Sequence, residues 1–85
     1  MEEEIGKITH YFSKISVGVI EITKGELRVG NTIHVKGHTT DFYQKVHSLQ
    51  VEHSPVDVIK PGESAGLKVE SAVRENDLVL KVTEE

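Results

Sequence analysis

The chain has 85 residues, of which 36% are hydrophobic, 28% are charged and none is cysteine. This length fits one small domain, and the composition excludes both a disordered chain and a disulfide-stapled secreted domain. A chain without cysteine favours a cytoplasmic location. No apolar run reaches the length of a membrane span, so we expect no membrane partner.

The net charge of −4 is unevenly placed along the chain. Five of the 14 acidic residues lie in the two tails, and the remainder of the chain is close to neutral. The sequence therefore lacks the basic field that drives nonspecific nucleic-acid binding. We expect an acidic tail over residues 1–4, a single domain over residues 5–82 and a second acidic tail over residues 83–85.

Alternation of apolar and polar residues predicts six strands. In chain order they cover roughly residues 5–11, 15–22, 32–36, 42–53, 64–69 and 78–82. The alternation changes phase within the fourth strand, which predicts a β-bulge near His47 and Ser48. Residues 54–60 follow as an arm or a short strand. An open sheet of six strands would expose an apolar face and two edges. We therefore expect an all-β fold, a six-stranded antiparallel Greek-key closed barrel.

Several phrases of the sequence recur in one known family. They are Ile5–Ile8, Gly25–Gly37, Lys45–Gln50, Lys60–Val69 and Glu75–Leu80. In this order they resemble the β-barrel domain 2 of translational GTPases such as elongation factor Tu, over roughly residues 5–82. They also resemble small stand-alone elongation factor-like proteins. A related barrel is appended to some collagenase-like bacterial peptidases.

The sequence departs from this family at several points. Asn31 and Asn76 stand at turn positions where the family has other residues, and asparagine tolerates a left-handed backbone nearly as well as glycine. The GTPase domain is missing, and no Gly-x-x-x-x-Gly-Lys-Ser/Thr phosphate loop is present. We therefore expect no nucleotide, no other cofactor and no nucleotide hydrolysis.

Sequential antiparallel strands would bring three connections to one end of the barrel. All four aromatic residues and two of the five histidines lie there. Aromatic rings beside cations can bind single-stranded RNA or a peptide. In the alternative interpretation, Phe12 and Phe42 plug the barrel, and Tyr11 and Tyr43 cover them. The candidate binding residues are His10, Tyr11, Phe12, Lys14, His38, Thr39, Thr40, Asp41, Tyr43 and Arg74.

The sequence gives little support for catalysis or metal binding. His38 and Asp41 lack a third, orienting group nearby in sequence, so we expect no enzyme activity. His34 alternates with apolar Ile33 and Val35, which predicts a solvent-facing histidine, and nothing predicts that the histidines converge on a metal ion.

The resemblance implies a noncatalytic binding module that docks to the ribosome, to tRNA or other RNA, or to a translation protein. The alternative is an accessory β-barrel subunit acting in trans with an enzyme such as a collagenase-like peptidase. In either case the partner is ribosomal RNA, tRNA or a protein. The apolar residues of the segment 54–59 offer a further possible partner edge or pack on the barrel.

Overall fold

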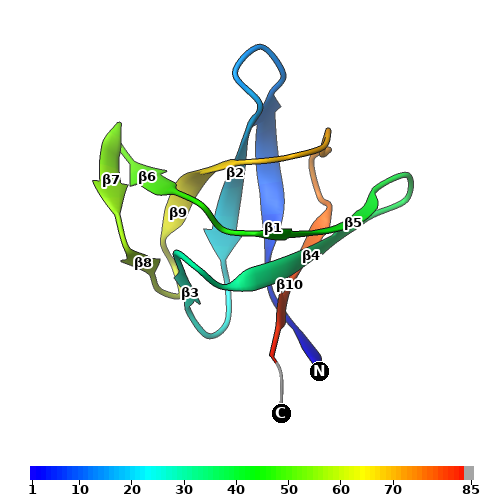
Figure 1. Cartoon of the computed structure of the whole chain (residues 1–85), viewed down its shortest axis with the longest axis horizontal. Coiled ribbons are helices and arrows are strands. Elements are labelled where there is room, and N and C mark those ends of the chain that lie inside the picture. The colour runs from blue at the N-terminus through cyan, green and yellow to red at the C-terminus, as the bar shows by residue number, and fades with distance from the viewer. Residues whose placement is uncertain (84–85) are drawn as a thin grey trace.

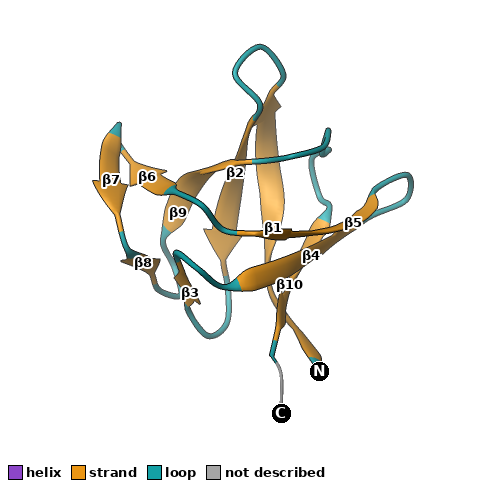
Figure 2. Cartoon of the chain, in the orientation of Figure 1, coloured by secondary structure: helices purple, strands orange, loops and turns teal. Residues whose placement is uncertain are grey.

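The computed structural model describes residues 1–83, and this part of the chain forms ten β-strands joined by turns and loops (Figure 2). Glu84 and Glu85, which belong to the expected C-terminal tail, lie outside the described residues. Between residues 1 and 83 there is no helix of the length and apolarity that a membrane span requires. The strands are β1 (Glu2–Phe12), β2 (Val17–Ile22), β3 (Leu27–Arg28), β4 (Thr32–Lys36), β5 (Asp41–Lys45), β6 (Leu49–Val51), β7 (Ser54–Val56), β8 (Val58–Ile59), β9 (Ser64–Lys68) and β10 (Leu78–Val82).

Eight strands form one sheet in the order β5-β4-β10-β1-β2-β9-β6-β7, and β3 pairs with β8 in a second, small sheet. All of these pairs are antiparallel. The large sheet is curled, since β5 at one end of the order leads along the chain to β6 near the other end (Figure 1). The prediction of an all-β antiparallel fold is confirmed. Within residues 1–83 no strand pairing joins β5 to β7, so a closed six-stranded Greek-key barrel stays a prediction.

A core of isoleucine, leucine and valine lies inside the curled sheet. In β2, Gly18, Ile20 and Ile22 are buried, while Val17 and Val19 face outward and are half-buried. This alternation places one face of each strand in the core. The fully buried side chains are Ile5, Ile8, Ile20, Ile22, Leu27, Ile33, Val35, Val46, Leu49, Ile59, Leu67, Val73 and Val79.

The strand boundaries correct two predictions. The first strand begins at Glu2 instead of Ile5, because Glu2, Glu3 and Glu4 pair with the end of β10. The predicted strand over residues 42–53 is two strands, and the bulge expected near His47 and Ser48 is a break between them. At the break the backbone of Val46 leaves the ladder and bonds to Gly30 and Asn31. The register shifts of the sheet lie in β1 instead, between Glu4 and Gly6 and between Ile8 and His10.

A buried glutamine connects β5, at one end of the strand order, to β9, near the other end. Gln44 of β5 is 4% exposed. Its Nε2 donates to the carbonyl oxygens of Lys45, at 3.1 Å, and of Lys68, at 3.0 Å. Its Oε1 accepts from the backbone N–H of Glu70 at 2.8 Å. This side chain therefore links β5 to the end of β9, where no backbone pairing is present between the two strands.

Candidate functional site

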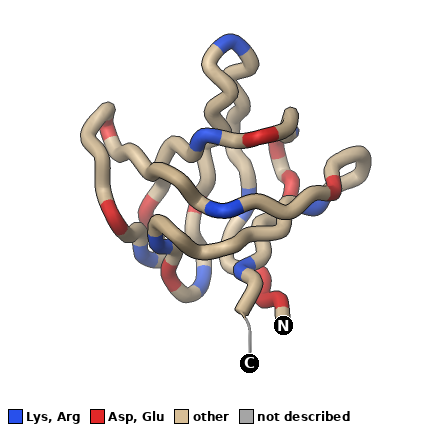
Figure 3. The backbone as a smooth tube through the Cα atoms, in the orientation of Figure 1, with Lys and Arg blue, Asp and Glu red and all other residues tan. Residues whose placement is uncertain are grey.

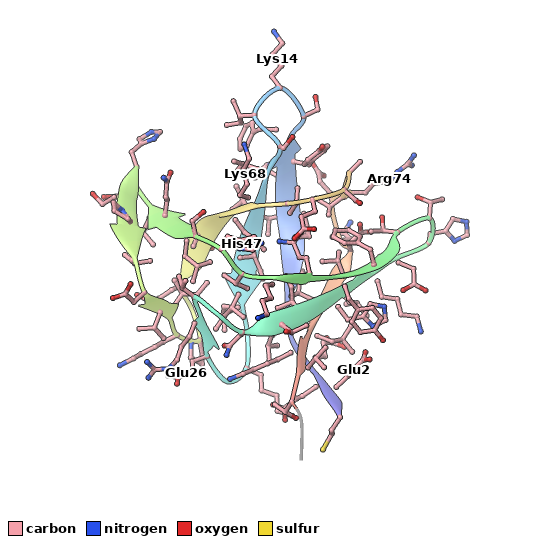
Figure 4. The ribbon with its side chains drawn as sticks, viewed as in Figure 1. Glu2, Lys14, Glu26, His47, Lys68 and Arg74 are labelled. Atoms are coloured by element: carbon pink, nitrogen blue, oxygen red, sulfur yellow. The ribbon has the colours of Figure 1, made fainter. Side chains whose placement is uncertain are left out.

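The structure brings together parts of the three connections that were predicted to share one end of the barrel, residues 10–14, 37–43 and 73–77. His10 of β1 lies 3.7 Å from Glu75 (Nδ1 to Oε1) in the loop before β10. Gly37, directly after β4, packs so closely on Asp77 that a Cβ there would overlap the Asp77 carboxylate. Lys14 lies at the tip of the β1–β2 turn and points away from the molecule, well separated from Arg74 (Figure 4). Asp41 and Tyr43 of β5 instead contact His34 and Glu2, and Glu2 starts β1, at the opposite end of that strand from His10. The ten candidate residues therefore do not converge on one site, and a binding role for them stays a prediction.

The burial of the four aromatic residues differs from the interpretation in which Phe12 and Phe42 plug the barrel and Tyr11 and Tyr43 cover them. Tyr11 and Phe42 are half-buried and pack against the core. Phe12 and Tyr43 are 52% and 55% exposed. The physical reason is strand parity: Phe12 and Tyr43 fall on the outward positions of β1 and β5. Phe12 therefore does not plug the core, and its ring stacks loosely on that of His10, with centroids 6.4 Å apart.

Phe12 instead lines an apolar groove on the outer face of the sheet. The groove has a volume of about 230 Å³. Its floor is Gly66 of β9, which pairs with Val19 of β2 on one side and Gln50 of β6 on the other. Since glycine has no side chain, this row across three strands leaves a depression. The lining residues are Phe12, Ile15, Val17, Val19, Gln50, Glu52, His53 and Gly66.

The two banks of the groove differ in chemistry. Phe12 and Ile15, exposed by 52% and 57%, form the apolar bank together with β2. The β1–β2 turn that carries Ile15 is held down by Lys68, whose Nζ donates to the Ile15 carbonyl at 3.0 Å. The opposite bank is polar and carries Glu52 and His53. The groove therefore offers an apolar surface beside hydrogen-bonding groups, as protein-binding sites commonly do.

The polar bank is a strained turn. Glu52 and His53 have φ angles of 50° and 68°, and they join β6 to β7 as a two-residue connection between the paired residues Val51 and Ser54. Two successive positive φ angles define the type I′ hairpin turn, for which asparagine and glycine are preferred. Neither residue belongs to that class. Strained backbone of this kind clusters at functional sites. The strained turn therefore makes this groove a candidate binding site.

A second cluster surrounds His34, which the sequence placed in solvent. His34 does point outward from β4, but it is only 7% exposed, because side chains from β1 and β5 cover it. Its Nδ1 lies 2.6 Å from Glu2 Oε1, and its Nε2 contacts Asp41 Oδ1. Its ring stacks on Tyr43, with centroids 4.1 Å apart, and the Tyr43 hydroxyl donates to Glu2 Oε2 at 2.5 Å. The prediction that His34 faces solvent was therefore wrong, because side chains from two other strands cover it.

The carboxylates on both sides of His34 favour its charged form. The hydrogen bond to Glu2 raises the pKa of His34, burial opposes that rise, and the hydrogen bond to Asp41 adds to it. The pKa of Glu2 is lowered, first by the Tyr43 hydrogen bond and then by His34. The same bond to Glu2 raises the pKa of Tyr43. An imidazolium that donates from both nitrogens has no lone pair with which to accept a proton from a substrate, so the cluster is suited to holding strands together.

Sequence reasoning missed the groove and the role of Glu2. Ile15, Val17 and Val19 alternate along one strand, so an apolar outward face was visible in the sequence, as was Gly66 within a strand. The sequence did not predict that β2 pairs with β9 and β9 with β6, and these pairings form the groove. Within residues 1–83, no group of three or more histidine, aspartate or glutamate side chains is placed to hold a metal ion.

Comparisons with known proteins place the chain beside peptidases. No family model matches it. It is 38% identical over 82 residues to an uncharacterized protease of Methanocaldococcus jannaschii, covering 95% of this chain and 20% of that protein. It is 35% identical over 74 residues to a collagenase of Porphyromonas gingivalis, covering 86% of this chain and 20% of that protein. The chain thus spans about a fifth of the length of these relatives.

A solved structure has the same fold. It is the C-terminal domain of a proposed U32 peptidase from Geobacillus thermoleovorans, with a TM-score of 0.87 and 17% identity, covering 95% of this chain and 93% of that one. These findings overturn the assignment to the elongation factor-like proteins, and with it the translation role. The phrases that carried that resemblance lie in turns and strands of a barrel-like fold. They therefore indicated the type of fold, but the family inferred from them was wrong. The chain is similar to one segment of collagenase-type and U32-type peptidases.

Proposed function

We propose that the chain is a noncatalytic protein-binding module that works with a peptidase of the U32 or collagenase type, as an accessory subunit in trans. One observation carries the proposal. Nearly the whole chain aligns with a fifth of a protease, and nearly the whole chain matches the fold of an isolated peptidase C-terminal domain. We expect a segment that folds as a unit and recurs within peptidases to assist their action.

The noncatalytic part of this proposal is supported by the chemistry of the His34 cluster. Both ring nitrogens of His34 are taken up by carboxylates, and the Tyr43 hydroxyl donates to Glu2. A nucleophile or general base needs a free partner within reach of substrate. In this proposal the peptide-bond chemistry belongs to the partner, and the module supplies binding.

A protein partner is favoured by the distribution of charge. Lysines and arginines alternate with aspartates and glutamates along the backbone, so no long basic track is present in the described part of the chain (Figure 3). Binding along a nucleic-acid backbone depends on such a track. The exposed apolar side chains of Phe12 and Ile15 suit a protein surface instead. A cysteine-free module of this kind is suited to the reducing cytoplasm, where we place it.

The experiment is a binding measurement between the purified chain and the U32-type peptidases encoded in the same genome. Analytical ultracentrifugation and calorimetry detect the complex, and peptide hydrolysis is followed with and without the chain. We expect a stoichiometric complex with one peptidase, and no hydrolysis by the chain alone. Hydrolysis by the chain alone, or the lack of any complex with these peptidases, would overturn the proposal.

A further inference from the structure

We propose that the apolar groove above Gly66 is the docking site for an extended segment of the peptidase chain, which inserts a bulky apolar side chain between Phe12 and the β6–β7 turn. The inference rests on the proposed function and names the surface and the chemistry through which it acts. Three features of the groove carry it: its size, its two banks and its exposure.

The size of the groove selects a side chain over a cofactor or a drug-sized ligand. Its volume of about 230 Å³ lies below the roughly 300–1,000 Å³ of small-molecule sites. Only eight residues line it, whereas a stable interface between two folded proteins takes about 20–30 residues on each side. A short segment with one or two anchoring side chains fits these dimensions better than a second copy of this chain.

The two banks specify the chemistry of the segment. The apolar bank, with Phe12, Ile15 and Val17, matches a leucine-, methionine- or phenylalanine-sized side chain. On the other bank the Gln50 amide and the Glu52 carboxylate lie exposed, and they can accept from or donate to the backbone of an extended segment. Gly66 lets that segment approach the sheet closely, as glycine does where a backbone must come near.

The comparisons support the peptidase chain as the partner that occupies the groove. In each protease relative the segment that matches this chain is a fifth of the protein, so four-fifths remain to pack against it. Phe12 and Ile15, two of the most exposed large apolar side chains in the described part of the molecule, lie together at this groove. A paired exposure of this kind marks an interaction site more often than scattered apolar residues do.

The test uses the full chain, the purified peptidase and overlapping synthetic peptides of about 15 residues that cover the peptidase sequence. The double variant Phe12→Ser, Ile15→Ser removes the apolar bank, and Gly66→Ala fills the floor. We expect the double variant to bind the peptidase about 30-fold more weakly and Gly66→Ala about 10-fold more weakly. The peptides that bind should share a bulky apolar residue. Val29→Ser is the matched control, since Val29 is 41% exposed and does not line the groove; it should keep wild-type affinity.

The outcomes separate this inference from the proposed function. If the peptidase binds the wild type and the groove variants equally, while circular dichroism shows all of them folded, the groove is not the docking site and the proposed function stands. If bound peptides lack a bulky apolar residue, or if the double variant abolishes self-association of the chain, the assigned occupant is wrong. If neither the peptidase nor its peptides bind the wild type, the proposed function fails and the inference fails with it.

Discussion

His34 and Tyr43 lie directly opposite each other across β4 and β5, with ring centroids 4.1 Å apart and an angle of 13° between the ring planes. The stack holds the imidazole between Glu2 and Asp41, so that the start of β1 is fastened to the β4–β5 hairpin across β10. Four side chains from three strands act as one unit. Its charge state should therefore affect the stability of the sheet.

Stability should depend on pH through this unit. The folded-state pKa of His34 is raised above 6.5, so its contribution is complete below 6.5 and is lost as pH rises through the raised value. The folded-state pKa of Glu2 is lowered below 4.5, so its contribution is present above 4.5 and is lost as pH falls through the lowered value. The combined contribution is greatest between pH 4.5 and 6.5.

Urea unfolding at a series of pH values checks this prediction. We expect the free energy of unfolding of the wild type to fall as pH rises above 6.5, and His34→Gln to remove most of that fall. His47→Gln is the control, because His47 pairs with Glu70 at 3.4 Å (Nε2 to Oε2) but both side chains are largely exposed. A wild-type profile that stays flat above pH 6.5 would contradict the assigned role of His34.

Replacing Gln44 by methionine should destabilise the fold by about 2–3 kcal/mol. The reason is that the Lys68 carbonyl and the Glu70 N–H lose a buried partner while the volume of the side chain is kept. Chemical denaturation measures the difference. Gln50→Met is the matched control, since Gln50 is an exposed glutamine in a strand, and its effect should stay within about 0.5 kcal/mol. Equal effects of the two substitutions would refute the bridging role of Gln44.

Gly6→Ala should cost about 3 kcal/mol. A Cβ at Gly6 would overlap the backbone carbonyl of Glu21 on the neighbouring strand, beside the register shift in β1, and neither strand can move without breaking its pairs. At Gly66 the added Cβ would lie 3.2 Å from a methyl group of Val17, which faces outward and can shift by the few tenths of an ångström required. Gly66→Ala should therefore cost less than about 1 kcal/mol. Thermal unfolding of both variants measures the two costs, and equal costs would contradict the close packing of Gly6 on Glu21.

The β6–β7 turn should accept a stabilising pair of substitutions. Glu52→Asn together with His53→Gly supplies the residues that a type I′ turn prefers at the two positive φ angles. We expect a gain of about 1 kcal/mol in the free energy of unfolding. His47→Gly, outside the positive-φ positions, should instead lose about 0.5–1 kcal/mol. If the turn variant is no more stable than the wild type, the strain inferred at Glu52 and His53 is absent.

The sequence by itself determined the strand content, the apolar core and some of the turns. Alternation predicted β2, β4, β9 and β10 close to their observed bounds, because period-2 burial is a local property of a strand. The expectation that asparagine would take a left-handed turn holds at Asn76, with φ of 72°. At Asn31 the turn is held differently: the neighbouring Gly30 has the positive φ, and the Asn31 side chain accepts from the Arg28 N–H.

Only the tertiary structure decided which distant residues meet. Glu2 reaches His34, 32 positions away, and Gly66 lies between Val19 and Gln50, because the order of the strands sets these contacts and alternation carries no information about order. For the same reason the sequence showed His34 facing outward but could not show that side chains from two other strands bury it. The phrases in turns and strands were enough to indicate a barrel-like fold, while the groove and the His34 cluster depend on pairing between strands far apart in the chain.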